Sequence, residues 1–145
     1  MKFLCVESRE PAAINDMSER KPQFRVLVVD DNEEIVSSLT LVLQGAGYIV
    51  EGTANAASAM AVHRREAADA LLTDIFMPDT DGLECMRLFR KHWPAVKIIA
   101  MSGGGTVVRG NYLQSAEFAG ADGVLQKPFD PAALLEMLRQ LLNKA

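Results

Sequence analysis

The sequence is poor in cysteine, in histidine and in long apolar runs. Its two cysteines, Cys5 and Cys85, lie far apart and match no metal-ligand spacing, so we expect neither a disulfide nor a zinc site. Such cysteine usage favours a reducing cytoplasm as the location. No apolar run approaches the ~20 residues that a membrane span requires. The stretch Met1–Val6 begins like a secretory signal, but Glu7 and Arg9 end its apolar part too early.

Positive charge is also in short supply. The chain carries 15 Lys and Arg residues against 19 Asp and Glu residues, which gives a net charge of −4. An acidic chain is poorly suited to bulk binding of nucleic acid or of an anionic membrane, so we expect neither as a partner. The hydrophobic fraction of 49% and the charged fraction of 23% are typical of a soluble globular protein. A chain of 145 residues is long enough for one domain with a sizeable core.

The first 23 residues differ from the rest of the chain. Pro11 and Pro22 interrupt any period, and four basic residues balance four acidic ones. We interpret residues 1–23 as a flexible N-terminal extension, with a docking segment as the alternative. The domain itself is expected to span residues 24–145.

From residue 24 onward, apolar runs typical of buried strands alternate with stretches of helical period. The expected strands cover residues 25–29, 48–53, 70–73, 96–101 and 123–126. The expected helices begin after the candidate caps Asn32, Asn55 and Asp130, around Leu83, and near Val107. Five strands alternating with five helices predict a parallel sheet with helices on both faces. We expect the α/β flavodoxin-like (βα)5 fold with strand order 2-1-3-4-5.

Acidic residues follow two of these strands. Asp74 ends the run Ala70–Thr73, before a loop rich in helix and strand breakers, and Asp30 and Asp31 end the first strand. The predicted strand order brings all three carboxylates into one crevice, where their repulsion favours a hard divalent cation. Mg²⁺ held by carboxylates, waters and a phosphate is the expected form.

Two further polar residues belong to the same predicted crevice. Ser102 follows the fourth strand and Lys127 the fifth, and a hydroxyl with an ammonium is suited to holding a phosphoryl group. No His, Cys or activated Ser stands at a strand end, so a carboxylate is the available nucleophile. Each residue alone has an ordinary structural explanation, as a helix cap, a turn residue or a solvated charge. Their joint occurrence at the ends of four strands favours a site.

Residues 24–145 resemble the response-regulator receiver domain of two-component signalling, of the stand-alone type. The resemblance rests on Val28–Asp31, on Asp74 with Met77–Pro78 and Asp81–Gly82, on Ser102, and on Lys127–Phe129. It implies that Asp74 accepts a phosphoryl group from a phosphohistidine on a partner. It further implies that Mg²⁺ is held by Asp30, Asp31, Asp74 and the backbone carbonyl of Phe76.

The resemblance also implies roles and partners. Lys127 would pair with the acyl phosphate, Ser102 would reorient to hydrogen-bond it, and the Lys127–Pro128 peptide would be cis. The implied partners are a sensor histidine kinase or a histidine phosphotransfer protein, and a downstream protein that responds to the phosphorylated form. The protein would not be a conventional enzyme, although it would catalyse its own phosphorylation and dephosphorylation at Asp74.

Three positions depart from the family pattern. Val124 stands where the family usually carries a Tyr or Phe that turns inward on activation, so the two-state switch is expected to be weaker or to run through the loop after Ser102. The run Gly103–Gly105 makes that loop longer and looser than usual, because glycine loses more backbone entropy on ordering. Gly103 also replaces a small side chain beside the site, which opens access to Asp74, while Phe76 shields it.

Two alternatives remain. A receiver-like module that docks without phosphorylation is compatible with Val124. An Mg²⁺-dependent phosphohydrolase with an Asp nucleophile is disfavoured, because Phe76 occupies the position where that class needs a second Asp. With no output domain after the last expected helix, we expect signalling by docking or onward transfer; a part of a longer regulator or hybrid kinase is the other option.

Several residues are assigned no function. His63 and His92 are expected to be solvated or capping side chains, and Cys85 to lie on a helix surface or in a satellite core. Tyr112 is equally consistent with core packing and with an exposed contact to a partner.

Overall fold

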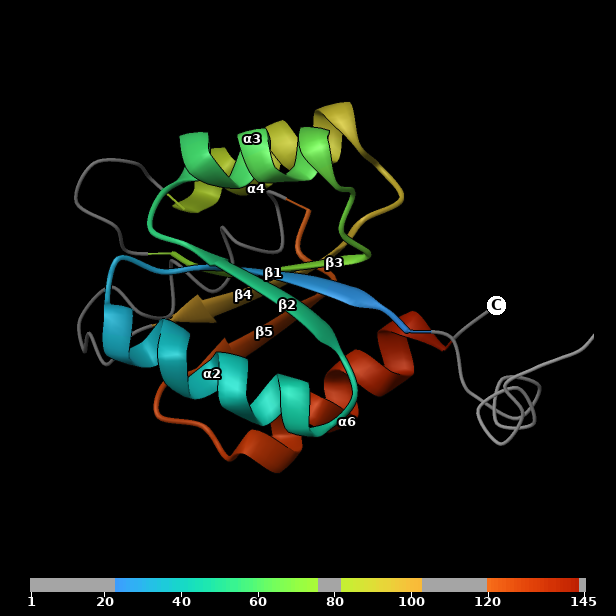
Figure 1. Cartoon of the computed structure of the whole chain (residues 1–145). Helices are drawn as coiled ribbons and strands as arrows, with labels where there is room; N and C mark the ends of the chain where they lie inside the picture. The colour runs from blue at the N-terminus through green and yellow to red at the C-terminus, as the bar shows by residue number, and fades with distance from the viewer. Residues whose placement is uncertain (1–22, 76–81, 103–119, 144–145) are drawn as a thin grey trace, which may run out of the picture.

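The computed structural model describes residues 23–75, 82–102 and 120–143, and its centre is a five-stranded parallel sheet (Figure 1). The strands are β1 (Arg25–Val29), β2 (Ile49–Thr53), β3 (Ala70–Asp74), β4 (Lys97–Ser102) and β5 (Gly123–Gln126). Their order is β2-β1-β3-β4-β5, with every neighbouring pair parallel. The predicted flavodoxin-like strand order is confirmed.

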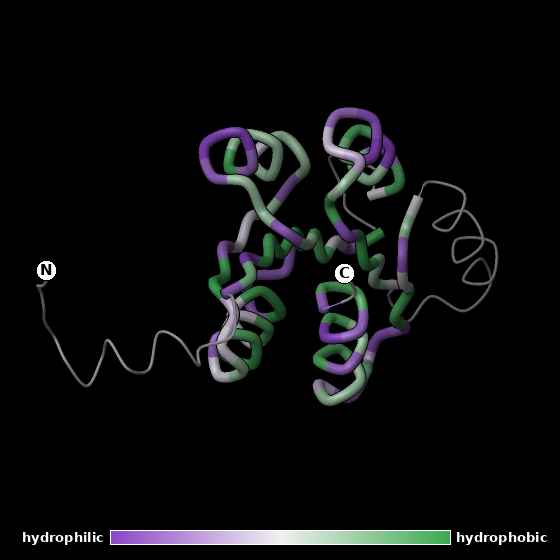
Figure 2. Tube along the Cα trace, turned by 90° about the vertical axis from the view of Figure 1, so that its right-hand side faces the viewer, coloured by the Kyte–Doolittle hydropathy of each residue, from purple (hydrophilic) through white to green (hydrophobic). Residues whose placement is uncertain are grey.

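Helices cover both faces of this sheet, as expected for parallel strands joined by helical crossovers. The described helices are α2 (Glu33–Gly45), α3 (Ala56–Arg65), α4 (Gly82–His92) and α6 (Pro131–Leu142). α3 and α4 lie on one face, and α2 and α6 lie on the other (Figure 1); Figure 2 shows the same layers from a second side. The helix predicted near residues 107–119 lies outside the described residues.

Each face of the sheet has its own hydrophobic cluster, because successive strand residues point to opposite faces. Leu71 and Ile98 join the cluster beneath α3 and α4, whereas Leu72 and Ile99 join the cluster above α2 and α6. All four side chains are fully buried. The continuous apolar runs in the sequence therefore reflect strands that are buried on both sides.

The three predicted helix caps are present. The Asn32 side chain accepts hydrogen bonds from the backbone N–H groups of Glu34 and Ile35, and Asn55 and Asp130 accept in the same way at α3 and α6. Each cap satisfies N–H groups that have no partner within the helix. Because Asn32 and Asp130 closely follow the ends of β1 and β5, these caps also fix the loops at that edge of the sheet.

Two predictions about single residues are wrong. His63 is not solvated: it is only 4% exposed, and its Nδ1 accepts a 3.0 Å hydrogen bond from the backbone N–H of Ala68. Its ring lies against Phe89 and Trp93, with centroid distances of 5.3 and 4.4 Å. The chain after α3 turns back to donate this bond and encloses the imidazole, which the helical period alone does not reveal.

Cys85 is likewise part of the main cluster under α4, with no exposed surface. Burial raises the pKa of the Cys85 thiol to about 12, so this group is an inert, protonated part of the core. Tyr112 lies outside the described residues. Within the part of the chain that the structure describes, no helix is long and apolar enough to cross a membrane.

Candidate functional site

Three carboxylates meet at the carboxyl ends of β1 and β3. Oxygens of Asp30, Asp31 and Asp74 all lie within 4.8 Å of one another. β1 and β3 are adjacent and Val29 pairs with Thr73, so the acids that follow these residues are level with each other. Asp30 and Asp74 are only 2% and 5% exposed, whereas Asp31 is open to solvent. The cluster is therefore anchored by two buried acids and has one solvent-facing side.

The Asp30 carboxylate is held at both oxygens. The backbone N–H of Asn32 donates to Oδ1 over 2.9 Å, and the Lys127 ammonium donates to Oδ2 over 2.7 Å. The backbone N–H of Asp30 in turn donates to the carbonyl of Thr53 on β2. Asp30 is thus oriented before any ligand arrives. The contribution of Asn32 was missed at the sequence level, where this residue appeared only as a helix cap.

Lys127 follows β5, the last strand in the sheet order, and its side chain extends toward the acids that follow β1 and β3. Its backbone N–H donates to the carbonyl of Ser102 over 2.7 Å, and the Lys127–Pro128 peptide is cis, as the family resemblance implied. Its Nζ lies 2.7 Å from Asp30 Oδ2 and 3.6 Å from Asp74 Oδ1, and the side chain is 17% exposed. One ammonium cannot balance three ionised carboxylates, so the site retains an excess of negative charge.

Ser102 ends β4, between the strands that supply Asp74 and Lys127. The residue is fully buried, and it pairs in register with Gln126 on β5. β3, β4 and β5 therefore bring Asp74, Ser102 and Lys127 to the same edge of the sheet, as predicted. Phe76 and the loop Gly103–Gly105 lie outside the described residues, and Val124 is half-buried against the cluster under α3 and α4.

Gly82 supports the site through the backbone, a role that its place in the Asp81–Gly82 motif did not indicate. A Cβ atom at this position would lie 2.1 Å from the backbone oxygen of Asp74 and 2.6 Å from Cα of Ile75. The backbone N–H of Gly82 donates to the carbonyl of Ile75 over 3.0 Å. The start of α4 thus rests directly on the backbone that carries Asp74, and only glycine permits this approach.

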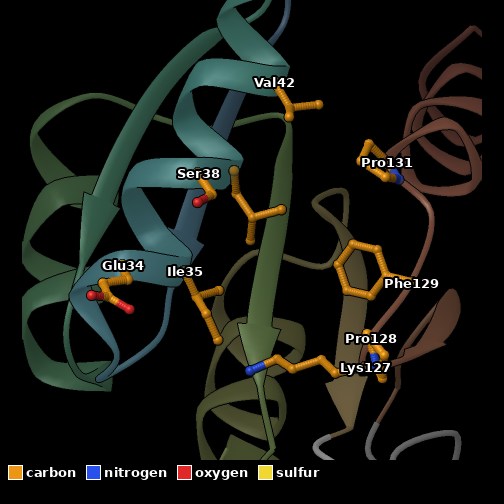
Figure 3. Close-up of a pocket in the computed structure, with 9 residues that line it drawn as sticks. Glu34, Ile35, Ser38, Val42, Lys127, Pro128, Phe129 and Pro131 are labelled. Carbon is orange, nitrogen blue, oxygen red and sulfur yellow. The ribbon is translucent and has the colours of Figure 1, made fainter.

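An apolar groove of about 570 Å³ opens beside Lys127, between α2 and the segment that leads from β5 into α6. Figure 3 shows its walls, with the Lys127 side chain extending across one end of the groove toward α2. The lining residues are Glu34, Ile35, Ser38, Leu39, Val42, Lys127, Pro128, Phe129 and Pro131. The acid cluster is therefore flanked by a hydrophobic surface.

Comparisons with known proteins agree with this geometry. A family model described as the response regulator receiver domain matches residues 26–139. The response regulator MprA of Mycobacterium leprae is 34% identical over 121 residues, which are 83% of this chain and 52% of MprA. This chain spans about half or less of the curated relatives that it matches.

Two solved structures are similar to this chain over nearly all of their own length. A CheY-like receiver domain protein from Methanospirillum hungatei has a TM-score of 0.77 at 32% identity, covering 84% of this chain and 95% of that chain. The chemotaxis protein CheY4 of Vibrio cholerae has a TM-score of 0.76 at 31% identity, covering 83% of this chain and 100% of that chain. Strand order, acid cluster, cis peptide and family match thus coincide, and the chain belongs to the response-regulator receiver domains of two-component signalling.

Proposed function

We propose that Asp74 is the phosphoacceptor of this receiver domain. The observation that carries the proposal is the meeting of Asp74 with Asp30, Asp31 and the Lys127 ammonium at the carboxyl edge of the sheet. Asp74 is buried, oriented by its position as the last residue of β3, and within 3.6 Å of a cation that can stabilise added negative charge. These are the features that a carboxylate nucleophile needs.

The reaction transfers a phosphoryl group between two nucleophiles. One carboxylate oxygen of Asp74 attacks the phosphorus of a phosphohistidine on the donor, an acyl phosphate bond forms, and the phosphorus–nitrogen bond breaks. The donor imidazole keeps the electron pair and takes up a proton. Such transfers depend on positioning and on charge stabilisation more than on covalent chemistry by the protein.

The residues present fit Mg²⁺. Three carboxylate oxygens within 4.8 Å of one another form a hard oxygen donor set, with more negative charge than Lys127 can balance. We propose that Asp30, Asp31, Asp74 and the backbone carbonyl of Phe76 hold the ion. When bound, Mg²⁺ supplies positive charge that brings the donor's phosphoryl oxygens close to Asp74.

The remaining roles follow from position. Lys127 can pair with a phosphoryl oxygen on Asp74, because its Nζ already lies between Asp30 and Asp74. Ser102 is proposed to reorient so that its hydroxyl donates a hydrogen bond to another phosphoryl oxygen. This reorientation would begin the conformational change that a partner detects. Val124 is too small to take the part of an inward-turning aromatic, so we expect a weaker switch or one carried by the loop after Ser102.

The proposed donors are a sensor histidine kinase or a histidine phosphotransfer protein in the cytoplasm. A downstream protein would distinguish the phosphorylated from the unphosphorylated form. The relatives are regulators rather than conventional enzymes, and we propose that this chain likewise catalyses only its own phosphorylation and dephosphorylation.

Incubation with Mg²⁺ and acetyl phosphate tests the proposal. Intact-mass spectrometry should detect one phosphoryl group per chain, and Asp74→Asn should abolish it. Multiple turnover of a phosphoester would instead identify a phosphohydrolase. Absence of labelling, with partner binding unchanged by Asp74→Asn, would identify a docking module that works without phosphorylation.

A further inference from the structure

We infer that Arg90 is a positioning residue for phosphoryl binding: it fixes the placement of β5 against β4, and thereby the position of Lys127 relative to Ser102. This inference rests on the proposed function of the acid cluster. Arg90 lies in the last turn of α4, and the partners that its guanidinium binds among the described residues are Pro94, Val96, Gly120 and Asp122. Its effect would therefore pass through the two strands.

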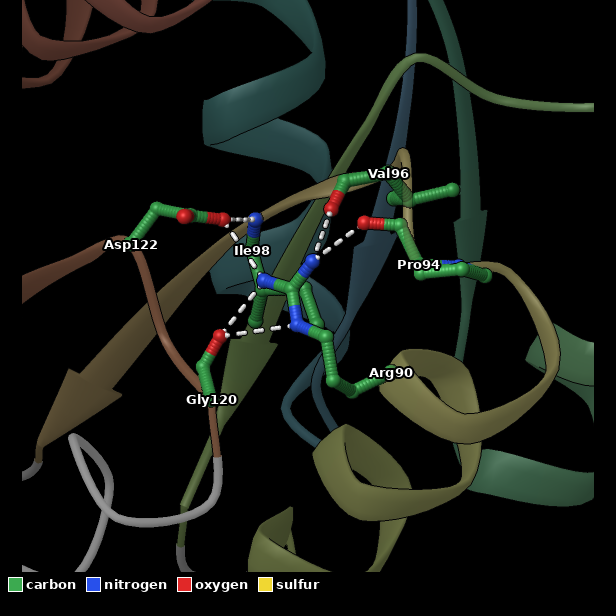
Figure 4. A network of polar contacts seen from close by, with 6 residues as sticks. All are labelled: Arg90, Pro94, Val96, Ile98, Gly120 and Asp122. Atoms are coloured by element: carbon green, nitrogen blue, oxygen red, sulfur yellow. Dashed lines mark hydrogen bonds and ion pairs between the residues drawn. The ribbon is translucent and has the colours of Figure 1, made fainter.

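The Arg90 guanidinium binds both the segment that leads into β4 and the segment that leads into β5 (Figure 4). Its Nη1 donates to the carbonyls of Pro94 and Val96, just before β4, over 2.7 and 3.1 Å. Its Nε donates to the carbonyl of Gly120 over 3.2 Å, and its Nη2 donates to the same carbonyl and, over 2.7 Å, to Asp122 Oδ2. A single planar group thus ties the segments that lead into both strands.

Asp122 extends this network into the sheet. Its Oδ2 also accepts the backbone N–H of Ile98 over 2.9 Å, and its own backbone N–H donates to the carbonyl of Ile98 over 2.7 Å. Asp122 therefore contacts β4 through both its side chain and its backbone, directly before the first residue pair of β5, Ile99 with Gly123. The Arg90 network, defined as Arg90, Gly120 and Asp122, holds the first end of β5.

The second end of β5 is the site itself. Lys127 follows β5 and donates its backbone N–H to the carbonyl of Ser102. β5 has only four residues and is the last strand in the sheet order, so a single neighbouring strand, β4, supplies its ladder. A four-residue strand with one ladder partner has few hydrogen bonds of its own, so the contacts at its two ends contribute strongly to its placement. Any displacement of β5 moves Lys127 with it.

The local geometry is specific for arginine. Gly120 has a φ of +106°, and a Cβ atom there would lie 3.0 Å from Arg90 Nε, so the guanidinium packs directly on this backbone. Arginine offers five donors in a fixed plane, whereas lysine offers three on a flexible stem. Only the former can bind four acceptors in different directions at once.

The Arg90 network binds the segments before β4 and β5, whereas the proposed metal ligands lie at the ends of β1 and β3. This separation makes the inference testable. Asp30 and Asp31 follow β1 and Asp74 ends β3, whereas the hydrogen bonds of the Arg90 side chain among the described residues go to the segments before β4 and β5. Ser102 and Lys127 come from β4 and β5. Loss of the network should weaken binding of a phosphoryl group without weakening Mg²⁺ binding, because displacing the Lys127 ammonium removes no ligand of the ion. A general loss of structure would weaken both.

The experiment measures these two affinities separately on the full chain, by isothermal titration calorimetry. Mg²⁺ is titrated first, and beryllofluoride, a phosphoryl analogue, is then titrated at saturating Mg²⁺. Arg90→Met should not weaken Mg²⁺ binding, and it should weaken beryllofluoride binding on the order of tenfold, since small misplacements of binding groups have effects of up to about a hundredfold. Arg139→Met, which breaks the exposed ion pair to Glu136, is the matched control and should change neither.

Two further variants keep the inference open to refutation. Asp122→Asn retains an acceptor for the Ile98 N–H but loses the ion pair with Arg90, so it should weaken beryllofluoride binding less than Arg90→Met does. If Arg90→Met does not fold, the result for Asp122→Asn tests the inference in its place. In a Lys127→Met background, Arg90→Met should have no further effect. Equal weakening of both ligands, or of neither, would overturn the inference. Failure of the wild-type chain to bind beryllofluoride would instead overturn the proposed function.

Discussion

Replacement of Gly82 by alanine tests how tightly the acid cluster depends on the backbone behind it. The added Cβ would lie 2.1 Å from the Asp74 carbonyl oxygen and 2.9 Å from that of Ile75, where ordinary contacts are 3.4–4 Å. Both neighbours are backbone atoms, so no side-chain rotation relieves the contact. The difference between 3.4 and 2.1 Å requires the end of β3 or the start of α4 to move by about 1.3 Å.

Such a shift should lower the free energy of unfolding and slow the phosphorylation of Asp74. Overpacking of this kind costs about 1–3 kcal/mol in the free energy of unfolding. Moving Asp74 by about an ångström relative to Asp30 and Asp31 should slow phosphorylation by up to about a hundredfold. The assay is the rate of labelling by acetyl phosphate at saturating Mg²⁺, with urea unfolding measured in parallel.

Gly45→Ala provides the matched control for Gly82→Ala. An added Cβ there meets nothing within 4 Å, and the residue ends α2 away from the acids. We expect an unchanged labelling rate and a stability change below about 1 kcal/mol, in the stabilising direction. A folded Gly82→Ala variant that is labelled at the wild-type rate would refute the argument that this backbone contact positions Asp74.

Three other perturbations have defined outcomes. Burial lowers the pKa of His63, and the charge of Asp69 opposes this shift, so the His63 imidazole binds a proton more readily in the unfolded chain than in the folded one. The free energy of unfolding should therefore be highest above pH ~6.5 and fall as the pH drops below it. Urea titrations from pH 5 to 8 should show a flatter profile for His63→Gln. Identical profiles would contradict this account. Lys127→Met should tighten Mg²⁺ binding, because an ammonium 2.7 Å from Asp30 Oδ2 is lost. The same change should slow phosphorylation by on the order of a hundredfold. Calorimetry measures the first effect and labelling the second, and a loss of both Mg²⁺ affinity and labelling rate would argue against the assigned role. Removal of residues 1–23, which we propose to lie outside the receiver domain, should leave the labelling rate of residues 24–145 unchanged; a slower rate would favour the docking alternative.

The sequence predicted most of the fold because each element carries its own signal. Strands buried on both faces appear as apolar runs, and Asn32, Asn55 and Asp130 mark the helix starts by ordinary capping chemistry. The wrong predictions concern side chains whose environment is made by distant segments. The position of His63 depends on Ala68, Phe89 and Trp93, and no periodicity within α3 encodes those contacts.

The site shows the same division. Asp30, Asp31, Asp74, Ser102 and Lys127 were predictable because strand ends converge once the strand order is known. The supporting residues were not, since Gly82 and Arg90 act through backbone atoms of other elements. A backbone carbonyl as a partner leaves no trace in the sequence around it, because every residue supplies one.

The placement of Lys127 shows why a receiver needs more than its acids. Three strands are required to bring its ammonium to Asp30: β1 carries the acid, β5 carries the lysine, and the carbonyl of Ser102 on β4 binds the lysine backbone. The acid cluster alone could be built from two adjacent strands, β1 and β3. Phosphoryl binding therefore depends on β4 and β5 in a way that metal binding does not. Because Val124 supplies no aromatic ring on β5, we expect the register and movement of these two strands to carry more of the response in this protein.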